Sequence, residues 1–132
     1  MNESPVQAAI LLALGSQKDI RMFRNLVGEG FVGIPPHKLQ RVTFGLAPGS
    51  GDLIGYRSYT IRPEDVGRTI AVFTSVEVKR PRNSHTQKNQ LSWLKSVQAR
   101  GGIAIISKSP AEALQDVLSW HPPAPAAPNS EP

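Results

Sequence analysis

The chain has 132 residues, a net charge of +5, a pI near 10.0 and no cysteine. Its length fits one domain, and the lack of cysteine excludes disulfides, thiolate zinc sites and cysteine catalysis. No apolar run approaches the roughly 20 residues of a membrane span, and Glu3 stands where a secretory signal needs positive charge. We therefore expect a cytoplasmic protein without membrane contact, whose basic character favours an anionic partner such as nucleic acid.

The N-terminal half predicts one helix followed by three strands. Asn2 is a good N-cap, Pro5 is tolerated in a first helical turn, and Gly15 stops the helix. Apolar residues cover most of its circumference, so we expect this helix to be buried or to pack against a partner. Strands are expected at residues 20–27, which Gly28-Glu29-Gly30 ends, at 41–46 and, after a turn rich in Gly and Pro, at 52–59.

The most strongly predicted strand runs from residue 70 to residue 79 and is rich in Val, Ile, Phe and Thr. A helix should follow from residue 84 to residue 100. Ser84 and Gln87 would form its Ser-x-x-Gln capping box.

A short buried strand is expected at 103–106, and 109–112 forms a second capping box for a helix that runs to about Trp120. The order strand, helix, strand predicts a parallel β-α-β unit. The whole order predicts an α/β fold with a mixed central β-sheet flanked by helices. We expect residues 1–120 to form this single domain and residues 121–132 to be a flexible Pro-rich tail.

Four residues point to a metal-dependent chemistry. Glu77 and Lys79 share one face of the expected strand, roughly 6–7 Å apart along it, while the Val78 side chain points the other way. Asp52 follows a Gly-Ser-Gly turn and begins a neighbouring strand. Two carboxylates and an ammonium so placed are typical of nucleases that cleave phosphodiesters with Mg²⁺ or Mn²⁺. The expected ligands are Asp52, Glu77 and the backbone carbonyl of Val78, while Lys79 orients the attacking water or stabilises transition-state charge.

The basic residues concentrate beside this predicted site. Between Lys79 and Ala111 there are seven basic residues and no acidic residue. A phosphate backbone held at the metal would lie against this stretch. Arg24 either contacts phosphate or closes a strand end. The candidate DNA contacts are Arg24, Arg80, Arg82 and Lys88.

Six short motifs stand in order at compatible spacing: Glu3-Ser4-Pro5-Val6-Gln7, Arg24-Asn25, Gly49-Ser50-Gly51-Asp52-Leu53-Ile54-Gly55, Val76-Glu77-Val78-Lys79, Gln90-Leu91-Ser92-Trp93-Leu94 and Gly101-Gly102-Ile103-Ala104. Together they resemble the virus-type replication-repair nuclease (VRR-NUC) domain, a branch of the PD-(D/E)XK restriction-endonuclease-like superfamily. The resemblance covers nearly all of residues 2–118. Two departures are Gly51, where the family often has Pro, and an insertion-like segment at 58–68.

The resemblance implies a restriction-endonuclease-like core with Asp52, Glu77 and Lys79 as catalytic residues, and with Glu3 and Gln90 lining the site. From the residues alone, Gln90 shares a helical face directed at the sheet, where it either points into the site or is simply a buried hydrogen-bonded residue. Glu3 is also explained by the preference for acids in a first helical turn. The family further implies a phage or prophage DNA-repair endonuclease, in a bacterial or phage-infected cell, acting as a homodimer on branched DNA such as a four-way (Holliday) junction.

Three other functions stay open: a non-catalytic basic nucleic-acid-binding module, a flap- or single-strand-directed nuclease, and a phage structural or regulatory protein with an inert site. Trp93 is expected to be a core or interface residue rather than a base-stacking platform. The three histidines are scattered, which disfavours a zinc site. No Walker or Rossmann motif predicts a nucleotide cofactor.

Overall fold

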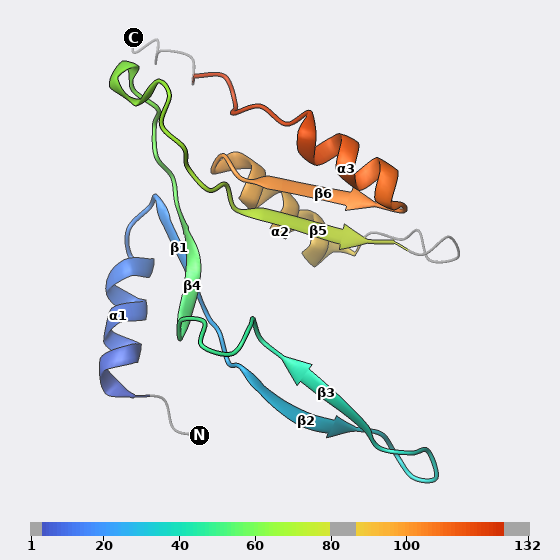
Figure 1. Ribbon diagram of the computed structural model, residues 1–132. Coiled ribbons are helices and arrows are strands. Elements are labelled where there is room, and N and C mark those ends of the chain that lie inside the picture. Colours follow the sequence, from blue (N-terminus) through green and yellow to red (C-terminus); the bar gives the residue numbers. More distant parts are fainter. Residues whose placement is uncertain (1–3, 80–86, 126–132) are drawn as a thin grey trace. The chain divides into compact units, whose positions relative to one another are not determined.

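The computed structural model describes residues 4–79 and 87–125, and its contacts divide the chain into two compact units, Met1–Tyr59 and Thr60–Pro132. The described residues form three α-helices and six strands, which pair into three two-stranded sheets (Figure 1). The predicted mixed α/β class is therefore confirmed, whereas one continuous central sheet stays a prediction. No helix in the described part of the chain has both the length and the apolar character needed to cross a membrane.

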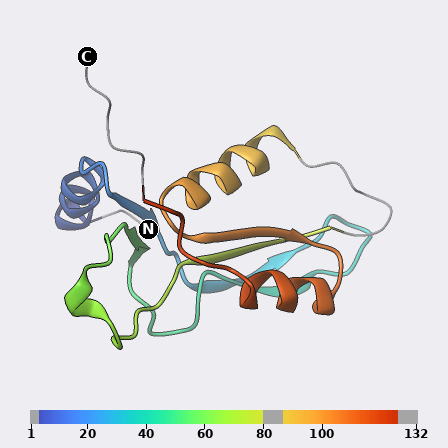
Figure 2. The same cartoon turned by 90° about the horizontal axis from the view of Figure 1, so that it is seen from above.

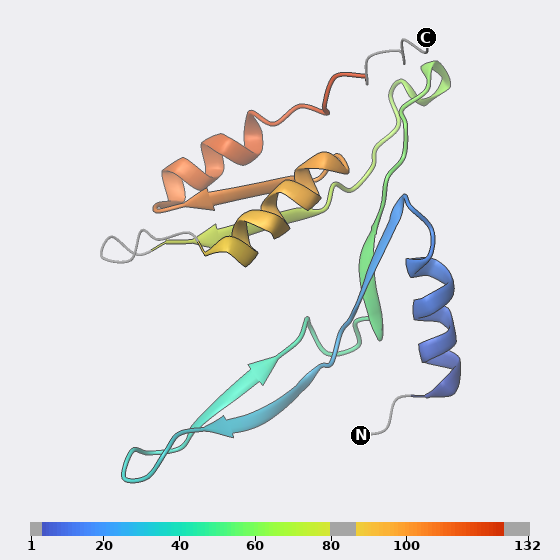
Figure 3. The same cartoon turned by 180° about the vertical axis from the view of Figure 1, so that it is seen from behind.

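In the N-terminal unit, helix α1 (Pro5–Gly15) lies beside strand β1 (Ile20–Arg24), which pairs antiparallel with β4 (Leu53–Arg57) (Figures 1 and 3). The predicted stop of the helix at its glycine is confirmed. The helix begins at Pro5 with Ser4 as its N-cap. Asn2, the predicted cap, lies outside the described residues.

The same unit contains an antiparallel hairpin of β2 (Gly28–Val32) and β3 (Gln40–Phe44). The prediction that Gly28-Glu29-Gly30 ends a strand is wrong, because these residues begin β2. Gly28 pairs with Phe44, and a Cβ on this glycine would stand 2.7 Å from the phenyl ring. A larger residue at this position would therefore have to displace the Phe44 ring, and cross-strand pairing outweighs the low strand propensity of glycine.

The C-terminal unit is a β-α-β arrangement followed by a helix. Strand β5 (Thr74–Val78) pairs in parallel with β6 (Ile103–Ser107), as the order of elements predicts. Helices α2 (Lys88–Ala99) and α3 (Pro110–Leu118) lie on opposite faces of this pair (Figure 2), and a short 3₁₀ turn (Pro63–Asp65) precedes it.

The start of α2 differs from the prediction. The helix begins at Lys88 with Gln87 as its N-cap, so the expected Ser84–Gln87 capping box is wrong, and Ser84 itself lies outside the described residues. The Gln90 side chain, three residues into the helix, accepts a hydrogen bond from the Gln87 backbone N–H at 3.0 Å. A glutamine at this position satisfies a backbone donor that the first helical turn leaves unpaired.

Helix α3 begins as its sequence predicts. Ser109 Oγ accepts a hydrogen bond from the Glu112 backbone N–H at 3.2 Å. The Glu112 carboxylate accepts from the Lys108 N–H at 3.4 Å rather than from Ser109, so the predicted box is only half formed. The helix ends at Leu118, two residues before the predicted Trp120.

The core of the C-terminal unit lies between α2 and the two strands. Among the described residues, the buried apolar side chains are Val97 at 0%, Ile103 at 6% and Ala104 at 4% exposure. Gln98 on α2 also donates to the Ala104 carbonyl at 2.9 Å. These contacts fix α2 against the strand face that carries the candidate site.

Candidate functional site

The turn that carries Asp52 is held by one asparagine at the end of β1. The Asn25 backbone N–H donates to the Asp52 carbonyl, and its side-chain Nδ2 donates to Ser50 Oγ and to the Gly51 carbonyl, each at 2.8 Å. Its Oδ1 accepts from the Leu46 N–H at 3.0 Å. Four hydrogen bonds from one residue therefore fix the backbone on both sides of the turn, while the Asp52 side chain is exposed.

Arg24 lies on the same strand end. It pairs with Leu53, the residue that follows Asp52, and its side chain is exposed. The N-terminal unit thus brings a predicted DNA contact to the strand position beside a predicted ligand.

In the C-terminal unit, burial alternates along β5 as the sequence predicts. Ser75 and Glu77 are half-buried, and Lys79, which follows the strand, is 8% exposed. Val76 and Val78 point to the other face and are exposed. The Lys79 N–H continues the ladder by donating to the Ser107 carbonyl at 2.9 Å, which keeps its side chain on the face of Glu77.

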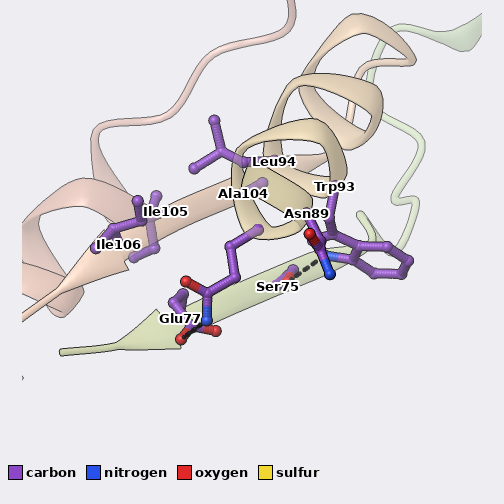
Figure 4. Close-up of a pocket in the computed structure, with 9 residues that line it drawn as sticks. Ser75, Glu77, Asn89, Trp93, Leu94, Ala104, Ile105 and Ile106 are labelled. Atoms are coloured by element: carbon purple, nitrogen blue, oxygen red, sulfur yellow. Dashed lines mark hydrogen bonds between the residues drawn. The ribbon is translucent and has the colours of Figure 1, made fainter. Parts of the chain in front are cut away.

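Gln90 joins these two charged residues. Lys79 Nζ donates to Gln90 Oε1 at 2.6 Å. Gln90 Nε2 donates to Oε1 of Glu77, also at 2.6 Å (Figure 4). The ammonium also lies 3.5 Å from Glu77 Oε1, which makes an ion pair. One carboxamide therefore orients a lysine and a glutamate while its oxygen also caps α2.

The electrostatic balance of this group follows from its burial. A nearly buried ammonium requires a charged or hydrogen-bonding partner, and Lys79 has both in Glu77 and Gln90. The Glu77 side chain is 40% exposed, so solvent screens the ion pair. Its second oxygen, Oε2, makes no hydrogen bond to any described residue.

A cavity of about 360 Å³ opens beside this group, between α2 and the two strands. Glu77 and Gln90 form part of its wall, and most of the remaining lining is apolar, including Trp93, Leu94 and Ile106 (Figure 4). The site is thus a carboxylate at the edge of a largely apolar hollow.

The metal prediction concerns two carboxylates and a main-chain carbonyl. Within 4–79 and 87–125, no group of three or more His, Asp or Glu side chains could hold a metal ion. Glu77 and Val78 belong to the C-terminal unit and Asp52 to the N-terminal unit. Their shared coordination of one ion therefore stays a prediction.

The predicted site residues fall into three groups. The C-terminal unit brings together Glu77, Lys79 and Gln90, with Val78 between the first two and Lys88 exposed at the start of α2. The N-terminal unit brings Arg24 to Asp52. Glu3, Arg80 and Arg82 lie outside the described residues.

Sequence reasoning missed two roles. The role of Asn25 in holding the turn was not predicted, because a residue that acts through hydrogen bonds to a turn leaves no periodic pattern in the sequence. Trp93 Nε1 donates to Ser75 Oγ at 2.9 Å, a contact that the i, i+3 spacing of Trp93 from Gln90 on the helix could have suggested.

Comparisons with protein-family models, curated proteins and solved structures find no match.

Removal of the Gln90 side chain should lower the stability of the fold by a measurable amount. We expect Gln90→Ala to lower the free energy of unfolding by about 2–3 kcal/mol, because α2 loses a cap and the buried Lys79 ammonium loses an acceptor. Gln98→Ala, which removes one neutral hydrogen bond from the same helix, should cost only about 1 kcal/mol. Urea denaturation of both variants measures the difference, and equal losses would contradict the bridge.

Proposed function

We propose that this protein is a Mg²⁺- or Mn²⁺-dependent DNA endonuclease that hydrolyses phosphodiester bonds. The observation that carries the proposal is the hydrogen-bonded group of Glu77, Gln90 and Lys79 at the end of β5. An ion pair with only a structural role on a strand surface does not require its lysine to be buried and hydrogen-bonded to a glutamine. A reaction that develops negative charge on a phosphoryl group does need a fixed ammonium beside a carboxylate.

The finer fold belongs to the same proposal. We propose that the chain forms the restriction-endonuclease-like core that its sequence resembles. In this core Asp52, which directly precedes β4, and Glu77 on β5 would bind the same ion.

The proposed ligands fit a hard divalent ion. Two carboxylates and the Val78 carbonyl supply only oxygen donors, which Mg²⁺ and Mn²⁺ prefer. Glu77 presents its unbonded Oε2, because Gln90 and Lys79 occupy Oε1. When bound, such an ion neutralises phosphoryl charge and lowers the pKa of a water molecule.

The residues of the chain perform the remaining work. Lys79 donates a hydrogen bond to a phosphoryl oxygen or to the attacking water, and Gln90 holds its ammonium in place. Arg24, Lys88, Arg80 and Arg82 neutralise phosphates along the bound strand, as the positive net charge favours.

The proposed assembly is a homodimer that cuts branched DNA. Helix α1 supports it, because its side chains Val6 and Leu12 are 67% and 75% exposed and Ile10 is 45% exposed. A helix with such apolar surface is a plausible contact between copies, and two active sites are needed to cut two strands of a four-way junction.

Light scattering should give about twice the chain mass of 14.3 kDa at micromolar concentration. Leu12→Lys should shift the protein toward the monomer, because a charge replaces an exposed apolar side chain at the contact. Gln17→Lys adds the same charge beyond the end of α1 and should leave the dimer intact. A wild-type monomer at the concentration that supports cleavage would refute paired cutting.

Cleavage itself is tested with a synthetic four-way junction, a flap and a plain duplex in Mg²⁺, Mn²⁺ or EDTA. Cutting should require the metal and favour the junction. Asp52→Asn, Glu77→Gln and Lys79→Ala should each lower the rate at least about 100-fold, as removal of a transition-state contact does.

Lys95→Ala is the matched control, because it removes an exposed lysine from the same basic stretch and should retain nearly full activity. Binding without cleavage, unchanged by EDTA and by Asp52→Asn, would sink the nuclease proposal and establish the non-catalytic module instead. Preference for the flap would retain hydrolysis and replace the junction as substrate.

A further inference from the structure

The cavity beside Glu77 has the properties of a ligand pocket. Its volume of about 360 Å³ lies within the range of small-molecule sites, which are mostly apolar with a few polar groups. Its lining comes from α2, β5 and β6, all within the C-terminal unit, and includes the Glu77 carboxylate (Figure 4). Of the residues that line the cavity, the proposed reaction uses only Glu77 and Gln90, so the apolar part of the hollow has no assigned role.

Trp93 is held rigidly in the wall of this pocket. Its indole N–H donates to Ser75 Oγ at 2.9 Å, and its ring meets Phe73 edge-on, with centroids 6.3 Å apart. The side chain is nevertheless 39% exposed, so of the two roles that the sequence predicts, core or interface, it is not a core residue. A fixed, partly exposed indole that lines a cavity offers a flat surface for stacking without the entropic cost of ordering it.

Asn89 supplies a polar group at the same place. It lies one helical turn before Trp93, and both project from α2 over β5 (Figure 4). Its carboxamide makes no hydrogen bond to any described residue, although it lines the cavity. A carboxamide has a hydrogen-bond donor and an acceptor side by side. This pair can bond to the edge of a nucleobase, and among the bases it fits adenine best.

We propose that this cavity binds one unpaired nucleobase of the DNA substrate, stacked on Trp93 and hydrogen-bonded by Asn89. The choice of a nucleotide as occupant rests on the proposed nuclease function. Ser75, which anchors Trp93, and Glu77 are two residues apart on β5, or roughly 6–7 Å. That offset lets a phosphate lie at the carboxylate while the base of the same nucleotide reaches the indole.

The occupant must be unpaired, because a base inside a duplex cannot reach a walled hollow without leaving its stack. Unstacked bases are most available at junctions, flaps and single strands. The pocket therefore provides a physical reason for structure selectivity that requires no reading of sequence.

The test uses the full chain in EDTA, so that catalysis plays no part. The chain has two tryptophans, Trp93 and Trp120. Their indole N–H signals in ¹H–¹⁵N spectra are assigned with Trp120→Phe. Titration with 5′-dAMP should shift the Trp93 signal to saturation and leave the Trp120 signal unchanged. Deoxyribose 5-phosphate, which lacks the base, should not shift either signal.

Asn89→Ala should weaken dAMP binding at least about fivefold, in keeping with the loss of a base-edge contact, and an unshifted Trp120 signal shows that the fold is intact. Lys95→Ala on the same helix should bind dAMP as the wild type does. Absence of a Trp93 shift, or an equal shift with deoxyribose 5-phosphate, would overturn the pocket.

The two proposals fail separately. A protein that cleaves junctions in Mg²⁺ but shows no Trp93 shift loses the base pocket and retains the nuclease. A protein that binds dAMP at Trp93 but cleaves no DNA retains the pocket and loses the nuclease.

Discussion

The hydrogen bonds of one carboxamide, that of Gln90, hold the candidate site together. Its oxygen accepts from the buried Lys79 ammonium and from the first turn of α2, and its nitrogen donates to Glu77. The same carboxamide therefore fixes both the position of α2 on the strands and the orientation of the two charged side chains. The buried Lys79 ammonium uses Gln90 as an acceptor, so loss of this carboxamide would disturb the site and the packing of α2 together.

Periodic features of the structure could be predicted from the sequence. The predicted alternation correctly placed Glu77 and Lys79 on one face, although the strand begins at Thr74 rather than at residue 70. The order of elements correctly predicted the parallel pairing of β5 with β6. Features that depend on one long-range contact could not be predicted. Gly28 begins β2 through its pairing with Phe44 on β3, and Asn25 holds the Asp52 turn through partners more than 20 residues away. No local propensity encodes either contact.

The capping of α2 was mispredicted for a related reason. Ser84 is the better N-cap by intrinsic preference, yet the helix begins at Lys88, where Gln90 can serve the cap and the strand at once. Tertiary hydrogen bonds outweigh a local preference of about 1 kcal/mol. The proposed base pocket lies on the same helix, where Asn89, directly before Gln90, and Trp93, on the next turn, line the cavity together with Gln90. One helix face thus carries both the orientation of the charged group and the proposed selection of an unpaired nucleotide.

The central prediction for the site is that Asp52 and Glu77 bind the same cation. Paramagnetic broadening by Mn²⁺ tests it directly, because bound Mn²⁺ broadens only the NMR signals of nearby nuclei. We expect the backbone amide signals of Leu53 and Val78 and the Gln90 side-chain amide to broaden together, at the same Mn²⁺ concentration, and to recover in EDTA. Broadening of Val78 and Gln90 while Leu53 stays sharp at every Mn²⁺ concentration would contradict the shared site.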